Sequence, residues 1–108
     1  NRQDAVKQLA LESDYMIVVG SINSSNSNRL KELAEKCGCR SVLIDEFDDL
    51  DLSQLDGCNN ISITAGASAP EERVQEVAQA LKKYLGASII ENGIDRENIF
   101  FKLPPSLR

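Results

Sequence analysis

The sequence contains no histidine and no apolar run of the length needed to cross a membrane. Histidine is the side chain whose ordinary pKa lies closest to neutral pH. Any acid or base acting at neutral pH would therefore be a perturbed carboxylate, lysine or cysteine, or would come from another domain. The first residues, Asn1–Asp4, lack the basic start and apolar core of a secretory signal. We therefore expect a cytoplasmic protein.

Cysteine is scarce and odd in number, with Cys37, Cys39 and Cys58 as the full set. An odd count without a secretory signal argues against a disulfide framework. Cys37 and Cys39 are separated by one residue, which is not the spacing of common zinc or redox sites, and no histidine is present to complete a zinc set. Cys37 continues an apolar helical stripe. We therefore interpret it as a buried small apolar residue and predict no metal ligand in this chain.

Positive charge is in deficit, since 12 basic and 17 acidic residues give a net charge of −5. This balance disfavours a general nucleic-acid or anionic-membrane surface, although a local anion site stays open. A chain of 108 residues with 42% hydrophobic content is sufficient for a single domain, residues 1–108, with one modest core.

The hydrophobic pattern alternates between the periods of helices and strands. The continuous apolar run Tyr15–Val19 is typical of a strand buried on both faces. The helix that begins near Arg29 carries Leu30, Leu33 and Ala34 on one stripe, and Gly38 lies where a left-handed C-terminal cap is expected. In order, the pattern predicts a helix at 3–11, a strand at 15–19, a helix at 29–37, strands at 41–44 and 61–64, a helix at 71–85, a strand at 87–91 and an extended piece at 99–101.

Strands that alternate with helices indicate a parallel sheet with helices on its faces. The predicted fold class is therefore α/β, a three-layer α/β/α domain with a mostly parallel four-stranded sheet. In such sheets, ligands bind outside the carboxyl ends of the strands.

Two unusual loops leave strands at that edge. In the first, every residue from Ser21 to Asn28 except Ile22 is serine or asparagine, and the second runs from Thr64 to Pro70. Small hydroxyl and amide side chains beside a helix N-terminus suit an anion, because the outward backbone N–H groups and the helix dipole add partial positive charge. Four or five charge-assisted hydrogen bonds, each contributing about 1.5–3 kcal/mol, could hold a diphosphate with few cationic side chains.

Helix capping is the simpler explanation of such serines. Ser68 and Glu71 have the spacing of a capping box, with Pro70 near the first helical turn, so capping accounts for the second loop equally well. One cap needs only one serine or asparagine, so capping alone does not explain the excess in the first loop.

The same residues carry a family resemblance across almost the whole chain. Five segments resemble signature segments of the 4-hydroxy-3-methylbut-2-enyl diphosphate reductase (LytB/IspH) family: Asn1–Val6, Val19–Ser21, Asn23–Leu30, Thr64–Pro70 and Arg96–Pro104. In that family three similar α/β domains surround a four-iron four-sulfur cluster, and loops from all three hold the substrate's diphosphate. This chain resembles the C-terminal domain. The resemblance implies that Ser24, Ser25 and Asn26 bind the diphosphate from the first loop and Ser68 from the second.

The resemblance also implies what the full enzyme does. It reductively dehydroxylates its allylic diphosphate to isopentenyl and dimethylallyl diphosphate in the methylerythritol phosphate pathway of isoprenoid biosynthesis, with electrons from a ferredoxin- or flavodoxin-type donor. The setting would be the bacterial cytoplasm, or a plastid in a plastid-bearing organism. The family's cluster cysteines, diphosphate-contacting histidines and proton-supplying glutamate have no counterpart here, and Cys37, Cys39 and Cys58 match no ligand position. We therefore expect a truncated or naturally incomplete chain that binds no cluster, has no catalytic residue and is inactive without the two missing domains.

Two alternatives come from other classes of protein. A phosphosugar-binding domain of the sugar-isomerase type also uses serine-rich loops after parallel strands, but its Ser-x-Ser-Gly-x-Thr pattern is not found in this sequence. An α/β interaction module whose serine loops only cap helices is the other. Glu71 and Glu72 support it, since they follow Ser68 and would repel a diphosphate if they pointed inward.

Overall fold

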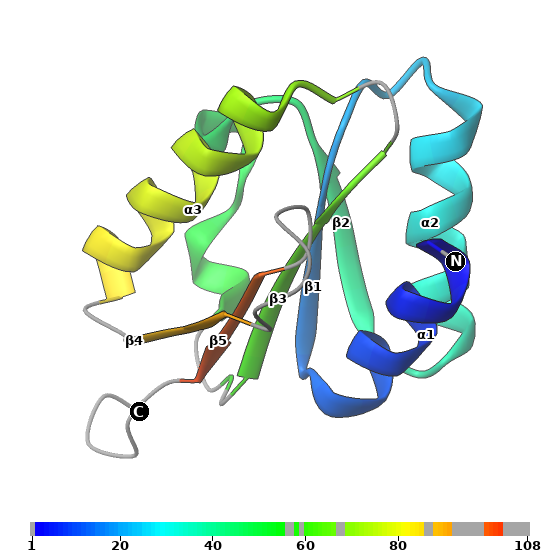
Figure 1. The fold of residues 1–108 in the computed structure, drawn as a ribbon, viewed down its shortest axis with the longest axis horizontal. Helices are drawn as coiled ribbons and strands as arrows, with labels where there is room; N and C mark the ends of the chain where they lie inside the picture. The colour runs from blue at the N-terminus through cyan, green and yellow to red at the C-terminus, as the bar shows by residue number, and fades with distance from the viewer. Residues whose placement is uncertain are drawn as a thin grey trace.

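The sheet lies between two layers of helices in a computed structural model, which describes residues 2–55, 58, 60–66, 69–85, 88–91 and 99–102. Helices α1 and α2 cover one face of the sheet, and α3 covers the other (Figure 1). The elements are α1 (Arg2–Glu12), β1 (Tyr15–Val19), α2 (Ser25–Lys36), β2 (Arg40–Ile44), the short 3-10 helices η1 (Phe47–Asp49) and η2 (Leu52–Leu55), β3 (Asn60–Ala65), α3 (Glu71–Leu85), β4 (Ser88–Glu91) and β5 (Ile99–Lys102). The predicted three-layer α/β class is confirmed.

Five strands form the sheet, in the order β2-β1-β3-β5-β4. Strand β1 lies in the centre of the parallel part, with Tyr15 opposite Arg40 of β2 and opposite Ile61 of β3. Strand β5 pairs antiparallel with both β3 and β4. The sheet therefore has five strands, of which three pair in parallel, so the predicted mostly parallel sheet of four strands is wrong in its number of strands and in the pairing of β4 and β5. Parallel neighbours need a crossover of about a dozen residues, and only positions 92–98 separate β4 from β5, so these two strands pair antiparallel.

The core is divided by the sheet into two clusters, as the unbroken burial of β1 requires. Alternate residues of this strand point to opposite faces. Ile17 and Val19 pack with the α3 side, where the buried helical residues are Val74, Val77, Ala78 and Leu81. Met16 and Val18 pack with Leu30 and Ala34 of α2 on the other side.

Helix α2 begins at Ser25, four positions before the predicted start near Arg29. Its C-terminal end matches the prediction. Gly38 has φ +88° and donates its N–H to the Glu35 carbonyl at 3.0 Å, which is the left-handed cap that glycine adopts without steric cost. Cys37 is half-buried and packs against the α1 and α2 cluster, so it is less enclosed than predicted. Within the described residues, no helix is long and apolar enough to cross a membrane.

Candidate functional site at the start of helix α2

The loops that follow β1 and β3 lie at the same edge of the sheet, where α2 and α3 begin (Figure 1). Backbone hydrogen bonds continue the sheet pairing into both loops. Gly20 donates its N–H to the Ile44 carbonyl at 2.8 Å, and Gly66 donates to the Val19 carbonyl at 3.1 Å. The two predicted loops are therefore brought together by rigid strand ends.

Ser24 is the N-cap of α2. Its backbone is extended, with φ −85° and ψ 118°, and its side-chain oxygen accepts the Ser27 N–H at 3.3 Å. A hydroxyl that accepts in this way still has its own proton to donate. Ser24 thus caps the helix as the simpler explanation predicts, and it keeps one donor for a ligand.

Ser25 and Asn26 are the first two residues of the helix, and both are exposed. Backbone N–H groups at these positions have no intrahelical acceptor, because the first turn of any helix lacks one. Their side chains add a hydroxyl and an amide at the positive end of the helix dipole. These two residues and the Ser24 hydroxyl therefore form a compact group of outward hydrogen-bond donors, which is the chemistry that binds phosphate oxygens.

The side chains of Ser21 and Asn28 have internal roles that the sequence did not indicate. The Ser21 hydroxyl accepts the Asn23 N–H at 3.1 Å, and the Ser21 carbonyl accepts the Ser24 N–H at 2.9 Å. The Asn28 side-chain nitrogen donates to the carbonyls of Ile22 and Ser24, both at 2.9 Å. The excess of small polar residues therefore divides into a structural set and the exposed residues Asn23, Ser25 and Asn26, of which the last two begin the helix.

Ser27 joins the two loops. Its side chain is fully buried, and its hydroxyl has no hydrogen-bond partner within the described part of the chain. A β-carbon added at Gly20 or Gly66 would come within 2.2 Å of the Ser27 hydroxyl oxygen. Both glycines are thus required by close approach of the helix to the strand ends, and Ser27 sets the distance between the first loop and the second.

Ser68, the predicted contributor from the second loop, lies outside the described residues, so the capping box with Glu71 also stays a prediction. The flanking backbone is described. Ala69 donates its N–H to the Gly66 carbonyl at 3.0 Å, and the Pro70 carbonyl accepts the Arg73 N–H at 3.0 Å. Residues 66 and 69 therefore lie at the same edge of the sheet as Ser24.

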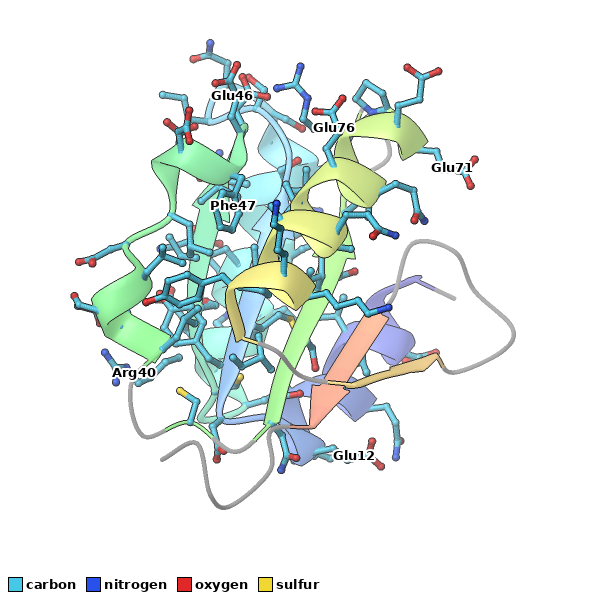
Figure 2. The ribbon with its side chains drawn as sticks, turned by 90° about the vertical axis from the view of Figure 1, so that its left-hand side faces the viewer. Glu12, Arg40, Glu46, Phe47, Glu71 and Glu76 are labelled. Carbon is cyan, nitrogen blue, oxygen red and sulfur yellow. The ribbon has the colours of Figure 1, made fainter. Side chains whose placement is uncertain are left out.

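Acidic side chains occupy the neighbouring part of this edge. Glu46 and Glu76 lie at the same end of the molecule, with Arg73 nearby, while Arg40 and Glu12 lie at the opposite end (Figure 2). The Arg73 guanidinium contacts the Asp45 carbonyl at 3.2 Å and the carboxylates of Glu46 at 3.5 Å and Glu76 at 4.0 Å. These groups compensate the charge of Arg73, so an anion is favoured at α2 rather than over η1.

Glu71 and Glu72 are exposed on α3. They line an open hollow of about 770 Å³ together with Gln75, Glu76 and Gln79, all on the same helix. This hollow lies along α3 and involves no residue of the first loop. Because both carboxylates are exposed, the repulsion that they would exert on an anion at the start of α2 is screened by solvent.

The buried groups with raised pKa values lie away from this site. Burial, with a smaller contribution from Asp14, raises the pKa of Cys39 to about 11. Burial also raises the pKa of Tyr15, against the opposing effect of Arg40. Tyr15 begins β1 and Cys39 directly precedes β2, so both are at the amino ends of the strands. Within the described residues, no group of three or more His, Cys, Asp or Glu side chains is arranged to hold a metal ion.

Fold and site together define a class: a three-layer α/β domain with a cluster of outward hydrogen-bond donors at the carboxyl edge of its sheet. The chain belongs to the LytB protein family, whose sequence model matches residues 1–82. It is 58% identical over all 108 residues to the 4-hydroxy-3-methylbut-2-enyl diphosphate reductase of Saccharophagus degradans and 54% identical to that of Alcanivorax borkumensis. The match covers 35% of each of these relatives, so the chain spans about a third of their length.

Comparison with solved structures also shows similarity to these reductases. The chain superimposes on the E-1-hydroxy-2-methyl-but-2-enyl-4-diphosphate reductase of Plasmodium falciparum with a TM-score of 0.73 and 35% identity, over 76% of this chain and 26% of that one. A structure described as (E)-4-hydroxy-3-methyl-but-2-enyl diphosphate reductase, the terminal enzyme of the non-mevalonate pathway, gives a TM-score of 0.72 and 32% identity, over 76% and 29%. The family resemblance expected from the sequence motifs is confirmed.

Proposed function

We propose that this chain is the diphosphate-binding C-terminal domain of a 4-hydroxy-3-methylbut-2-enyl diphosphate reductase. The observation that carries the proposal is the start of α2, where a capped helix presents the Ser24 hydroxyl and the exposed residues Ser25 and Asn26 at one point. The names of the relatives support the choice of ligand, because each acts on an organic diphosphate. Ser68 completes the proposed site from the second loop.

The role of these residues is to bind and orient. Donors fixed on a helix start need no rearrangement when an anion arrives, so little of the binding free energy is lost to ordering them. Holding the diphosphate at the edge of this domain would fix the position of the allylic carbon chain relative to the rest of the enzyme. Because carboxylates compensate the charge of Arg73, the donor cluster at the start of α2 is the favoured place for an anion on this domain.

A four-iron four-sulfur cluster is the cofactor we propose for the complete reductase, where it would supply the electrons for removal of the hydroxyl. The described residues of this chain do not fit such a group. Cys39 packs in the cluster on the α1 and α2 side of the sheet and Cys58 in the cluster on the α3 side, so their side chains lie on opposite faces. We therefore propose that the cluster ligands, the proton donor and the docking surface for a ferredoxin- or flavodoxin-type electron donor belong to the two other domains.

A chimera tests this function. The matching third of the Saccharophagus degradans reductase would be replaced by this chain, and consumption of the allylic diphosphate would be followed with a chemical reductant. We expect a working reductase whose kcat/KM falls about tenfold or more when Ser25→Ala is introduced, the effect of losing one charge-assisted hydrogen bond. A matched Gln8→Ala variant, on the exposed surface of α1, should retain the activity of the chimera. A folded chimera without activity, or one indifferent to Ser25→Ala, would contradict the proposal.

A further inference from the structure

The Asn28 side chain binds two backbone carbonyl groups of the first loop. Its side-chain nitrogen lies 2.9 Å from the Ile22 oxygen and 2.9 Å from the Ser24 oxygen. Both partners are carbonyls, which only accept hydrogen bonds, so the Asn28 side chain must present its NH2 group to them. Both hydrogens of that group are used. No other residue type of this size offers two donors from one atom without a charge, so the contact specifies asparagine.

The direction of these bonds determines which groups face a ligand. The Ser24 carbonyl also accepts the backbone N–H of Asn28 at 3.1 Å, so it points along the helix and away from its start. The Ile22 carbonyl points to the same side-chain nitrogen. A carbonyl oxygen carries partial negative charge, and one directed at a bound anion would repel it. With both oxygens drawn toward Asn28, the polar groups at the helix start are the Ser24 hydroxyl, the first N–H groups of α2 and the exposed side chains of Ser25 and Asn26.

We propose that Asn28 is a positioning residue of the anion site: its side chain holds the Ile22 carbonyl away from the ligand and reinforces the Ser24 carbonyl, which the Asn28 backbone N–H already directs along the helix, so that hydrogen-bond donors face the ligand at the start of α2. This inference rests on the proposed function for the choice of ligand, but its geometric part does not. Ile22 is 72% exposed, so the Asn28 hydrogen bond holds a residue that has little burial of its own.

The test compares the 108-residue chain with its Asn28→Ala and Asn28→Gln variants, with Gln8→Ala on α1 as the matched removal of an exposed amide. Three quantities are measured by NMR and thermal unfolding: the carbonyl carbon shifts of Ile22 and Ser24, the affinity for inorganic diphosphate from amide shifts, and the melting temperature. Carbonyl shifts report the hydrogen bonds directly and need no ligand.

In Asn28→Ala we expect both carbonyl resonances to move upfield and diphosphate affinity to fall about tenfold, because a released carbonyl oxygen can turn toward the anion and repel it. Asn28→Gln keeps the amide on a longer stem and should recover part of both effects, which a simple loss of packing would not predict. Gln8→Ala should match the parent chain in all three measurements.

The positioning role of Asn28 and the choice of diphosphate as ligand can be refuted separately. If the parent chain shows no diphosphate binding but the carbonyl shifts change as expected, the positioning of the loop stands and the proposed ligand is wrong for this chain. If Asn28→Ala binds diphosphate as tightly as the parent, or if the Ile22 and Ser24 carbonyl shifts are unchanged, the positioning role of Asn28 is overturned.

Discussion

Ser27 is the residue on which the spacing of the two loops depends, and its unpaired buried hydroxyl lowers the stability of the fold. A buried hydroxyl without a partner destabilises a protein by about 1–3 kcal/mol relative to a paired one. The Ser27→Ala variant should therefore be as stable as the parent chain or more stable, since the loss of an unpaired buried hydroxyl outweighs the few van der Waals contacts of one oxygen atom.

Gly66→Ala should be destabilising, because the new β-carbon would overlap the Ser27 hydroxyl oxygen at 2.2 Å. Overpacking of this kind costs about 1–3 kcal/mol. Combining it with Ser27→Ala leaves the new carbon 3.3 Å from the Ser27 β-carbon, a contact that small shifts relieve, so most of the stability should return. Urea unfolding of the two single variants and the double variant measures this coupling. Additive effects would show that Gly66 and Ser27 do not touch as described.

Cys39 gives a pH dependence of stability. Its pKa is raised from 9.0 to about 11, so the unfolded chain loses this proton first as the pH rises. The free energy of unfolding should therefore fall between about pH 9 and pH 11, by about 2–3 kcal/mol for a shift of this size. Tyr15 also has a raised pKa and acts in the same direction. Unfolding curves of the parent and of Cys39→Ala isolate the contribution of the thiol, and equal slopes for the two proteins above pH 9 would refute it.

Helix α2 shows what the sequence could and could not predict at the scale of an element. Its apolar stripe, its glycine cap and the strand before it follow from periodicity, and all three were confirmed. The start of the helix was misplaced because Ser25, Asn26 and Ser27 carry no hydrophobic period. Their helical conformation comes from the Ser24 cap and from the contact of Ser27 with the strand ends, which only tertiary structure provides.

The same helix start allows capping to be separated from ligand binding. Ser24→Ala removes the hydroxyl that accepts the Ser27 N–H, so it should lower stability by about 1 kcal/mol. Ser25→Ala changes an exposed residue and should alter stability by no more than about 0.5 kcal/mol. Thermal unfolding compares the two variants. If Ser25→Ala destabilises the chain as much as Ser24→Ala does, Ser25 has a structural role. Its presence in the serine- and asparagine-rich loop would then be explained without a ligand.

The sheet shows the limit of pattern reading at the scale of the whole molecule. Strands β1 to β4 were predicted close to their observed bounds, because short apolar runs mark strands, whereas β5 was predicted only as an extended piece. Their order was not, since the position of β5 between β3 and β4 depends on pairing between segments distant in sequence. The edge at which the candidate site lies was predictable, because it follows from the parallel direction of β1 and β3 alone.

The most direct test of the account is a two-dimensional NMR titration of this chain with inorganic diphosphate, with sodium chloride at matched ionic strength as the control. We predict shifts confined to the amides of Ser24, Ser25 and Asn26 and around Ser68, with a dissociation constant of about 1 mM, the weak affinity expected for part of a ligand shell. Unchanged spectra up to roughly fifty times that concentration, or shifts centred on Lys82 and Lys83 of α3, would contradict a preformed diphosphate site at the start of α2.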